Sequence, residues 1–183
     1  MTPTVIVPDA GPLFSLAPGD LLGILERFPL VLTDVVKEET VDKGLLPGCS
    51  FEAQRLLAFY ERHSRHVQVV ETQVGAQLRR HRRSDPKFVQ PRDLGELSIQ
   101  SYLIQLHDLN PSVRPMVLFE DSWFFEIRAG LPKSCLLIST EMFLRHAERL
   151  KIIHSAPLAR LAIQAARPDA SLFCCEIDLG QKP

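Results

Sequence analysis

Short apolar runs alternate along this chain with longer stretches in which apolar residues recur every three or four positions. The short runs are bounded by polar or turn-forming residues, which is typical of buried strands; they cover residues 4–7, 30–32, 67–70, 116–119 and 135–138. The longer stretches predict helices over 13–28, 34–43, 51–65, 93–109, 123–130, from 140 onward, and over 157–166. Because strands alternate with helices, we expect parallel strands that are covered on both faces. The predicted fold is α/β, a three-layer sandwich around a central parallel sheet of about five strands.

The domain organisation follows from breaks in this pattern. The dipeptide Pro18-Gly19 interrupts the first helical stretch. The stretch 72–92 has the least regular pattern in the chain and predicts an irregular, basic insertion. We therefore expect a single domain over 1–167 that contains this insertion, followed by a tail over 168–183.

Composition and charge exclude several classes of protein. The chain has 183 residues, 45% of them hydrophobic and 23% charged, as in an ordinary globular protein. Its net charge of −1 is not that of a polycation that coats nucleic acid. Four cysteines are too few for a disulfide framework, and the adjacent pair Cys174-Cys175 is poorly spaced for a tetrahedral zinc site. Since neither a secretion signal nor a membrane span is visible, we expect a cytoplasmic protein without membrane contact.

Acidic residues fall where the predicted strands end. The carboxyl ends of parallel strands meet at one edge of a sheet, where ligands bind. Carboxylates that gather there raise one another's pKa, and a hard cation such as Mg²⁺ or Mn²⁺ relieves their repulsion. The acids at or just after these ends are Asp9, Glu38, Glu39, Asp93, Glu96, Glu120 and Asp121.

Each of these acids also has a simpler interpretation. Asp9 precedes Ala-Gly-Pro and suits a plain turn. Glu38 and Glu39 suit the solvated surface of a helix. The spacing of Asp93 and Glu96 suits a capping box, and the doublet Glu120-Asp121 suits the positive N-terminus of the helix that follows. The candidate site therefore depends on all the acids occurring together.

Five blocks of this sequence resemble the PIN domain family, nucleases that include many toxins of toxin–antitoxin pairs. The most specific is VIVPDAGPLFSLA, whose aspartate is followed by a small-residue turn and Pro-Leu. The other blocks are 32–40 with its glutamates, 93–99 with Gly-Glu, 117–121 with paired acids, and 137–140 ending in threonine. The resemblance implies a parallel sheet, a Mg²⁺ or Mn²⁺ cofactor and cleavage of single-stranded RNA.

The resemblance also assigns roles to individual residues of this chain. It implies that the catalytic acids are Asp9, Glu39, Glu96 and Asp121. It implies that the metal ligands are Asp9, Glu96, Glu120 and Asp121, with the choice within the last pair left open. Glu38 and Thr140 would lie near the site.

Two departures from the family pattern leave an alternative open. The basic residues that often follow the fourth block are missing here, since the first is Arg128, and Ser139 stands where glycine often precedes the threonine. The alternative is a catalytically inactive PIN-like module that binds RNA or a protein partner. An antitoxin-like protein and a homodimer are both compatible with the resemblance.

A basic run follows the second acidic block. Residues 79–92 contain six lysines and arginines against one aspartate, and such a segment can bind a phosphate backbone. Its alternatives are a solvated surface or a contact with an acidic partner protein. The candidate RNA-binding residues are Arg79, Arg80, Arg82, Arg83, Lys87 and Arg92.

Overall fold

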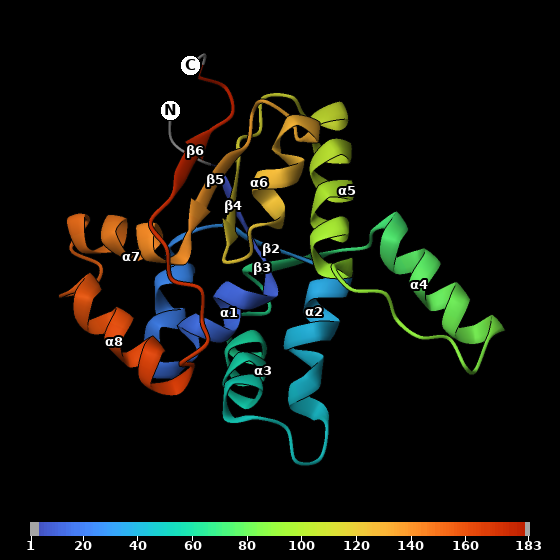
Figure 1. Ribbon diagram of the computed structural model, residues 1–183, viewed down its shortest axis with the longest axis horizontal. Helices are drawn as coiled ribbons and strands as arrows, with labels where there is room; N and C mark the ends of the chain where they lie inside the picture. The colour runs from blue at the N-terminus through green and yellow to red at the C-terminus, as the bar shows by residue number, and fades with distance from the viewer. Residues whose placement is uncertain (1–3, 182–183) are drawn as a thin grey trace.

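The computed structural model describes residues 4–181 and is built on one six-stranded sheet, in the order β3-β2-β1-β4-β5-β6 (Figure 1). The first five strands pair in parallel, and β6 runs antiparallel to β5. Their bounds are Val5–Pro8 (β1), Leu30–Thr33 (β2), Val67–Val70 (β3), Pro115–Phe119 (β4), Leu136–Ser139 (β5) and Glu176–Asp178 (β6). The predicted α/β fold is confirmed, with a sixth strand in addition to the five expected.

Helices flank the sheet on both faces. In Figure 1, α7 and α8 lie to the left of β4 and β5, α5 lies to the right, and α4 projects from the body. The α-helices are Ala10–Leu16 (α1), Asp34–Thr40 (α2), Phe51–His63 (α3), Gln73–Ser84 (α4), Leu94–Leu109 (α5), Trp123–Ile127 (α6), Thr140–Arg149 (α7) and Ala156–Ala166 (α8). The 3₁₀ segments are Pro18–Arg27 (η1), Asp42–Leu45 (η2) and Arg128–Gly130 (η3).

The strands form where the sequence is apolar without alternation. Every residue of β1, β2, β4 and β5 is buried, as expected for inner strands covered on both faces. In the edge strand β3 only Val67 is buried. The apolar core is therefore continuous across the inner strands, and it fixes where each strand ends.

Helices α2, α3, α4, α7 and α8 each begin after a serine or threonine whose hydroxyl accepts a backbone hydrogen bond. Thr33 Oγ1 accepts from the Val36 amide at 3.2 Å, and Ser50 Oγ accepts from the Ala53 amide at 3.2 Å. Such caps stabilise a helix by about 1 kcal/mol each. The capping-box interpretation of Asp93 and Glu96 is wrong, because Asp93 has a left-handed backbone (φ 60°) and its side chain makes no capping hydrogen bond.

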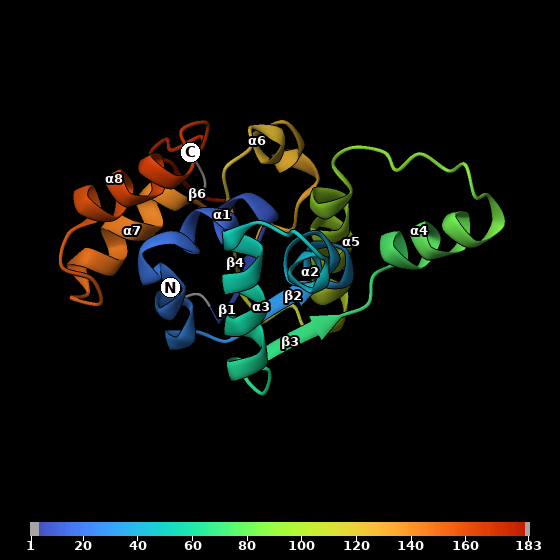
Figure 2. The ribbon, with the colours of Figure 1, turned by 90° about the horizontal axis from the view of Figure 1, so that it is seen from below.

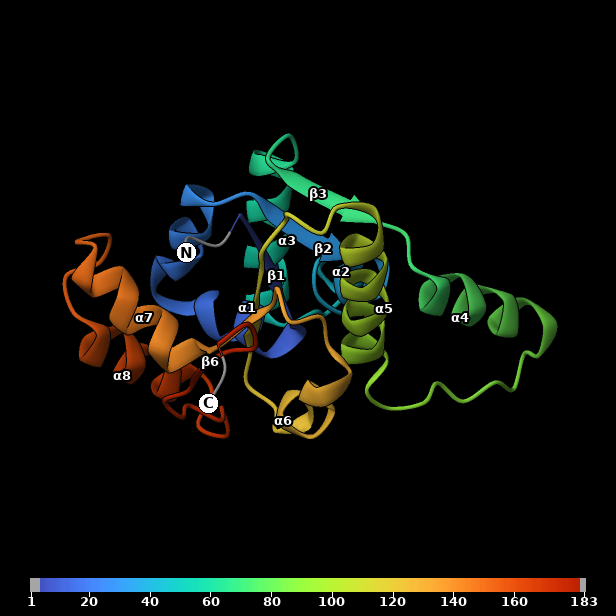
Figure 3. The ribbon, with the colours of Figure 1, turned by 90° about the horizontal axis from the view of Figure 1, so that it is seen from above.

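The basic insertion is more regular than we expected. Most of 72–92 forms helix α4, which Thr72 caps through its Oγ1, and only the part after Ser84 is irregular. Figures 2 and 3 show α4 standing away from the sheet, joined to the body at its first turns. Only Gly75 and Leu78 of this helix are buried, so its apolar periodicity is too weak to predict it.

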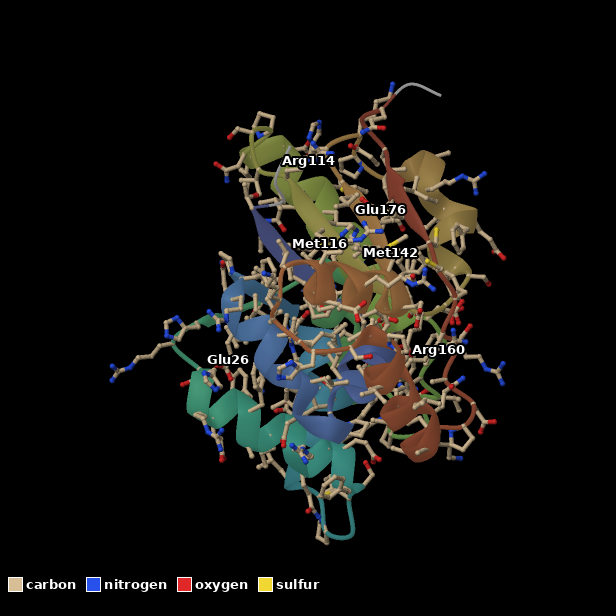
Figure 4. The ribbon with its side chains drawn as sticks, turned by 90° about the vertical axis from the view of Figure 1, so that its left-hand side faces the viewer. Glu26, Arg114, Met116, Met142, Arg160 and Glu176 are labelled. Carbon is tan, nitrogen blue, oxygen red and sulfur yellow. The ribbon has the colours of Figure 1, made fainter. Side chains whose placement is uncertain are left out.

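The segment after residue 168 is not a separate tail. Its strand β6 pairs with β5, and Asp178 forms an ion pair with Arg114, which lies just before β4. Figure 4 shows this side of the molecule, with Arg114 and Glu176 near the strands and Arg160 on α8. The four cysteines are free thiols, and no helix within 4–181 combines the length and apolarity that crossing a membrane requires.

Candidate carboxylate site

Asp9 lies at the carboxyl end of β1, at the centre of the sheet edge. Its backbone amide donates to the Leu118 carbonyl at 2.9 Å, which fixes its position beside β4. The residue is only 5% exposed, and its side chain makes no capping hydrogen bond to α1, although it occupies the N-cap position. The turn interpretation therefore does not explain why a carboxylate is buried here.

The surroundings of Asp9 disfavour its charged form. Burial raises the pKa of Asp9 to about 8, and the nearby carboxylates of Glu96, Glu39 and Glu120 raise the pKa further, against the lowering effect of the Ala10 amide. A group with this pKa is largely protonated at neutral pH unless a cation compensates its charge. Strongly shifted titratable groups of this kind are more common at functional sites.

Glu39 and Glu96 come from two helices that meet in front of Asp9. Gly95 makes the approach possible: a side-chain carbon on Gly95 would lie 2.8 Å from Glu39 Oε2 and 3.4 Å from Asp9 Oδ1. Burial and the neighbouring Glu96 raise the pKa of Glu39, and burial raises the pKa of Glu96. The predicted convergence of these three acids is seen in the structure.

The two acids that follow β4, Glu120 and Asp121, differ in burial and in their hydrogen-bond partners. Glu120 is 6% exposed, and its Oε1 accepts a hydrogen bond of 2.8 Å from Thr140 Oγ1 at the start of α7. Asp121 is exposed, and its Oδ1 accepts from the Trp123 amide at 2.8 Å, so it satisfies the first turn of α6. Glu120 is therefore the member that faces the interior of the site, while Asp121 still raises the pKa of Glu96 from outside.

Three groups around the site carry no clear signal in the sequence. Arg167, directly after α8, donates to Glu120 Oε2 at 3.3 Å. Thr33 and Ser98 share a buried hydrogen bond of 2.6 Å between β2 and α5, which joins the strand end to the helix that carries Glu96. An arginine before a proline and two hydroxyl residues are too common to be selected without the fold.

The donors are chemically suited to a hard cation, but they are not yet gathered around one point. All the acids offer oxygen, which Mg²⁺ and Mn²⁺ prefer. Among residues 4–181, no group of three or more His, Cys, Asp or Glu side chains is arranged to hold a metal ion. The structure thus brings the acids to one sheet edge without forming a closed coordination shell.

Two of the basic residues of α4 are engaged by acids of α2. Arg79 Nη1 lies 2.6 Å from Asp34 Oδ2, and Arg82 pairs with Glu38. Arg82 also donates to Gln90 Oε1 at 2.5 Å, and Gln90 Nε2 donates to Glu39 Oε1 at 3.5 Å. The basic segment therefore adjoins the carboxylate site. Glu38 helps to hold α4 against α2 through its ion pair with Arg82.

The remaining basic residues face solvent. These exposed candidates are Arg80, Arg83, Lys87 and Arg92. An open hollow of about 520 Å³ lies along the helix and is lined by Ala76, Arg79, Arg80, Arg83 and Ser84. Among the described residues, the ion pairs of this basic segment are formed by Arg79 and Arg82, and the four exposed candidates form none.

Comparison with known proteins does not assign a family. No family model, curated protein or solved structure matches the chain.

Proposed function

We propose that this protein is a Mg²⁺- or Mn²⁺-dependent ribonuclease of the PIN type, which cleaves single-stranded RNA in the cytoplasm. The observation that supports this most strongly is the burial of Asp9 among other carboxylates at the carboxyl end of a parallel sheet. Burying like charges together is costly for a fold, and a divalent cation would offset that cost.

The residues fit such a cation in chemistry. Asp9, Glu39 and Glu96 would hold it, since they approach one another where Gly95 lacks a side chain. When bound, Mg²⁺ or Mn²⁺ would supply Lewis-acid polarisation of water and of the phosphodiester. Side-chain rotation would complete the coordination shell, because no group of three donors is gathered within 4–181.

The chain itself would supply substrate positioning. Arg80 and Arg83, exposed on α4, would hold the RNA backbone by neutralising phosphates. The path from Arg82 through Gln90 to Glu39 places this cationic helix beside the acids.

A catalytically inactive PIN-like module that binds RNA or a protein partner is the second candidate. It is favoured by Arg167, which already supplies a positive charge to Glu120, and by the open arrangement of the acids. An antitoxin-like protein and a second copy of the chain stay predicted partners. The exposed side chains of Leu158 and Leu161 on α8, 66% and 60% accessible, are apolar surface on which such a partner could pack.

The test is cleavage of end-labelled single-stranded RNA with Mn²⁺ or Mg²⁺, with and without EDTA. We expect Asp9→Asn to reduce the rate by about 100-fold or more, because a buried acid of the site is lost. Asp108→Asn, on the exposed end of α5, is the matched control and should cleave like the natural chain. Full activity of Asp9→Asn would refute the nuclease, and RNA binding without any cleavage would select the inactive module.

A further inference from the structure

Arg167 reaches the carboxylate site from an element distant in sequence. Its Nη1 donates to the Gly11 carbonyl at 2.8 Å, to Ser15 Oγ at 2.5 Å and to Glu120 Oε2 at 3.3 Å. Two of these acceptors belong to α1, the helix that begins directly after Asp9. The side chain is 28% exposed, so the guanidinium is mostly enclosed by the groups it contacts.

These contacts engage both oxygens of Glu120. Oε2 faces Arg167, and Oε1 accepts from Thr140 at 2.8 Å. Gly11 permits the close approach, since a side-chain carbon there would lie 3.1 Å from Oε2. Each oxygen of Glu120 already accepts one hydrogen bond and the guanidinium offsets its negative charge, so Glu120 attracts a metal ion less than an unpaired carboxylate does.

The other inner acids lack a comparable partner. Among the hydrogen bonds of the described residues, these three acids accept from one side chain, Gln90, whose contact with Glu39 Oε1 is long at 3.5 Å. Lys43 and Arg82 lower the pKa of Glu39 by charge alone, without an ion pair to it. Asp9 lies 5% exposed without a capping contact. Among the described residues, the acidic cluster is thus divided into Glu120, which contacts a cation, and Asp9, Glu39 and Glu96, which form no ion pair.

We propose that Arg167 is a fixed counter-cation that withholds Glu120 from the divalent cation and leaves Asp9, Glu39 and Glu96 as its ligands. This inference rests on the proposed metal-dependent function. Arg167 acts here as a positioning residue, because it touches Glu120 rather than substrate.

The test is calorimetric titration of the full chain with Mn²⁺ alone, which needs no RNA and no turnover. Arg167→Met keeps an unbranched side chain, shorter than that of arginine, and removes the charge, so Glu120 becomes available to the metal. We expect Mn²⁺ to bind at least about fivefold more tightly, or a second ion to bind. In Arg167→Met/Glu120→Gln the gain should disappear, and the affinity should return to within about fivefold of the natural chain. Arg167→Lys, which retains the charge, should restore natural affinity.

Two results would overturn the inference. One is an unchanged Mn²⁺ affinity and stoichiometry in Arg167→Met. The other is a loss of more than about fivefold in the double variant, since that loss would make Glu120 a ligand already. If Arg167→Met fails to fold by circular dichroism, the double variant decides alone, because it leaves neither charge unpaired.

The same titrations separate this inference from the proposed function. If the natural chain binds Mn²⁺ but Arg167→Met is unchanged, only the role of Arg167 is refuted. If none of the variants binds Mn²⁺, the metal-dependent function fails and the inference fails with it. If Arg167→Met alone binds, the counter-cation stands while the natural chain is not a metal-dependent nuclease.

Discussion

Glu39 Oε2 lies beside the one position of α5 that has no side chain: a carbon added to Gly95 would be 2.8 Å from it. Such a distance is below normal contact, so the carboxylate and a larger residue cannot both occupy this space. The same point of the helix lies 3.4 Å from Asp9 Oδ1. Gly95 therefore sets how closely acids from β1, α2 and α5 can approach.

We predict that Gly95→Ala displaces Glu39 and weakens Mn²⁺ binding by about tenfold or more, since one ligand is moved. Alanine favours a helix by about 1 kcal/mol over glycine, and this gain offsets the cost of moving the Glu39 side chain. The free energy of unfolding should therefore change little. Calorimetry and thermal unfolding measure the two effects separately. Gly23→Ala in η1 is the matched control, because the nearest atom to its added carbon is 3.8 Å away. Unaltered Mn²⁺ affinity in Gly95→Ala would contradict this view of the site.

The raised pKa of Asp9 predicts that the metal-free protein loses stability as the pH rises. The folded chain keeps its proton up to about pH 8, whereas the unfolded chain releases it near the ordinary value of 3.8. The stabilising contribution is therefore complete below pH 3.8 and is lost progressively as the pH rises to about 8. The loss is on the order of a few kcal/mol, because each pKa unit corresponds to about 1.4 kcal/mol.

Chemical denaturation at a series of pH values in EDTA measures this effect. Asp9→Asn should flatten the pH dependence and should be more stable than the natural chain near pH 8. Excess Mn²⁺ should restore stability of the natural chain most at high pH, since cation and proton compete for the same carboxylate. A natural chain whose stability rises between pH 5 and pH 8 would disagree with the raised pKa.

The position of α4 depends on Asp34. Its Oδ1 accepts from the Thr72 amide at 3.2 Å and from Thr72 Oγ1 at 2.8 Å, while Oδ2 faces Arg79. We predict that Asp34→Ala releases α4 from the body. Amide hydrogen exchange in α4 should accelerate strongly while exchange in the sheet stays slow, because the inner strands have their own apolar core. Asp42→Ala, at the start of η2, is the control, and equal protection of α4 in both variants would contradict this anchor.

Exposed and paired arginines of α4 should differ in their effect on RNA. Arg80→Ala/Arg83→Ala removes two unpaired cations, so RNA affinity should fall and the salt dependence should become weaker by about 0.7 per lost phosphate contact. Arg149→Ala, at the exposed end of α7, serves as the control. Filter binding over a range of salt concentrations gives both quantities. An unchanged salt slope in the double variant would indicate that α4 does not bind the RNA backbone.

The strands and most helices could be read from the sequence because their residues are buried without interruption or at helical spacing. Strand β4, for example, is apolar throughout, and α3 begins at Phe51, where the predicted range 51–65 begins. Helix α4 was missed for a physical reason: its stability comes from contacts with Asp34 and Glu38 on α2, not from an apolar face of its own. Strand β6 was missed because its residues are polar or half-buried at the edge of the sheet.

By itself, the sequence determined that acids come directly after the strands. It also predicted that these acids meet, because the carboxyl ends of parallel strands lie at one edge of the sheet. It could not determine which carboxylate is compensated and which is not. That was decided by the tertiary structure, which turns Asp121 outward to the Trp123 amide and brings Arg167 from across the chain to Glu120. The physical reason is that the free energy of a charged side chain depends on the groups that surround it in space. Asp9 is buried, and Glu120 contacts an opposite charge, only because segments distant in sequence pack together.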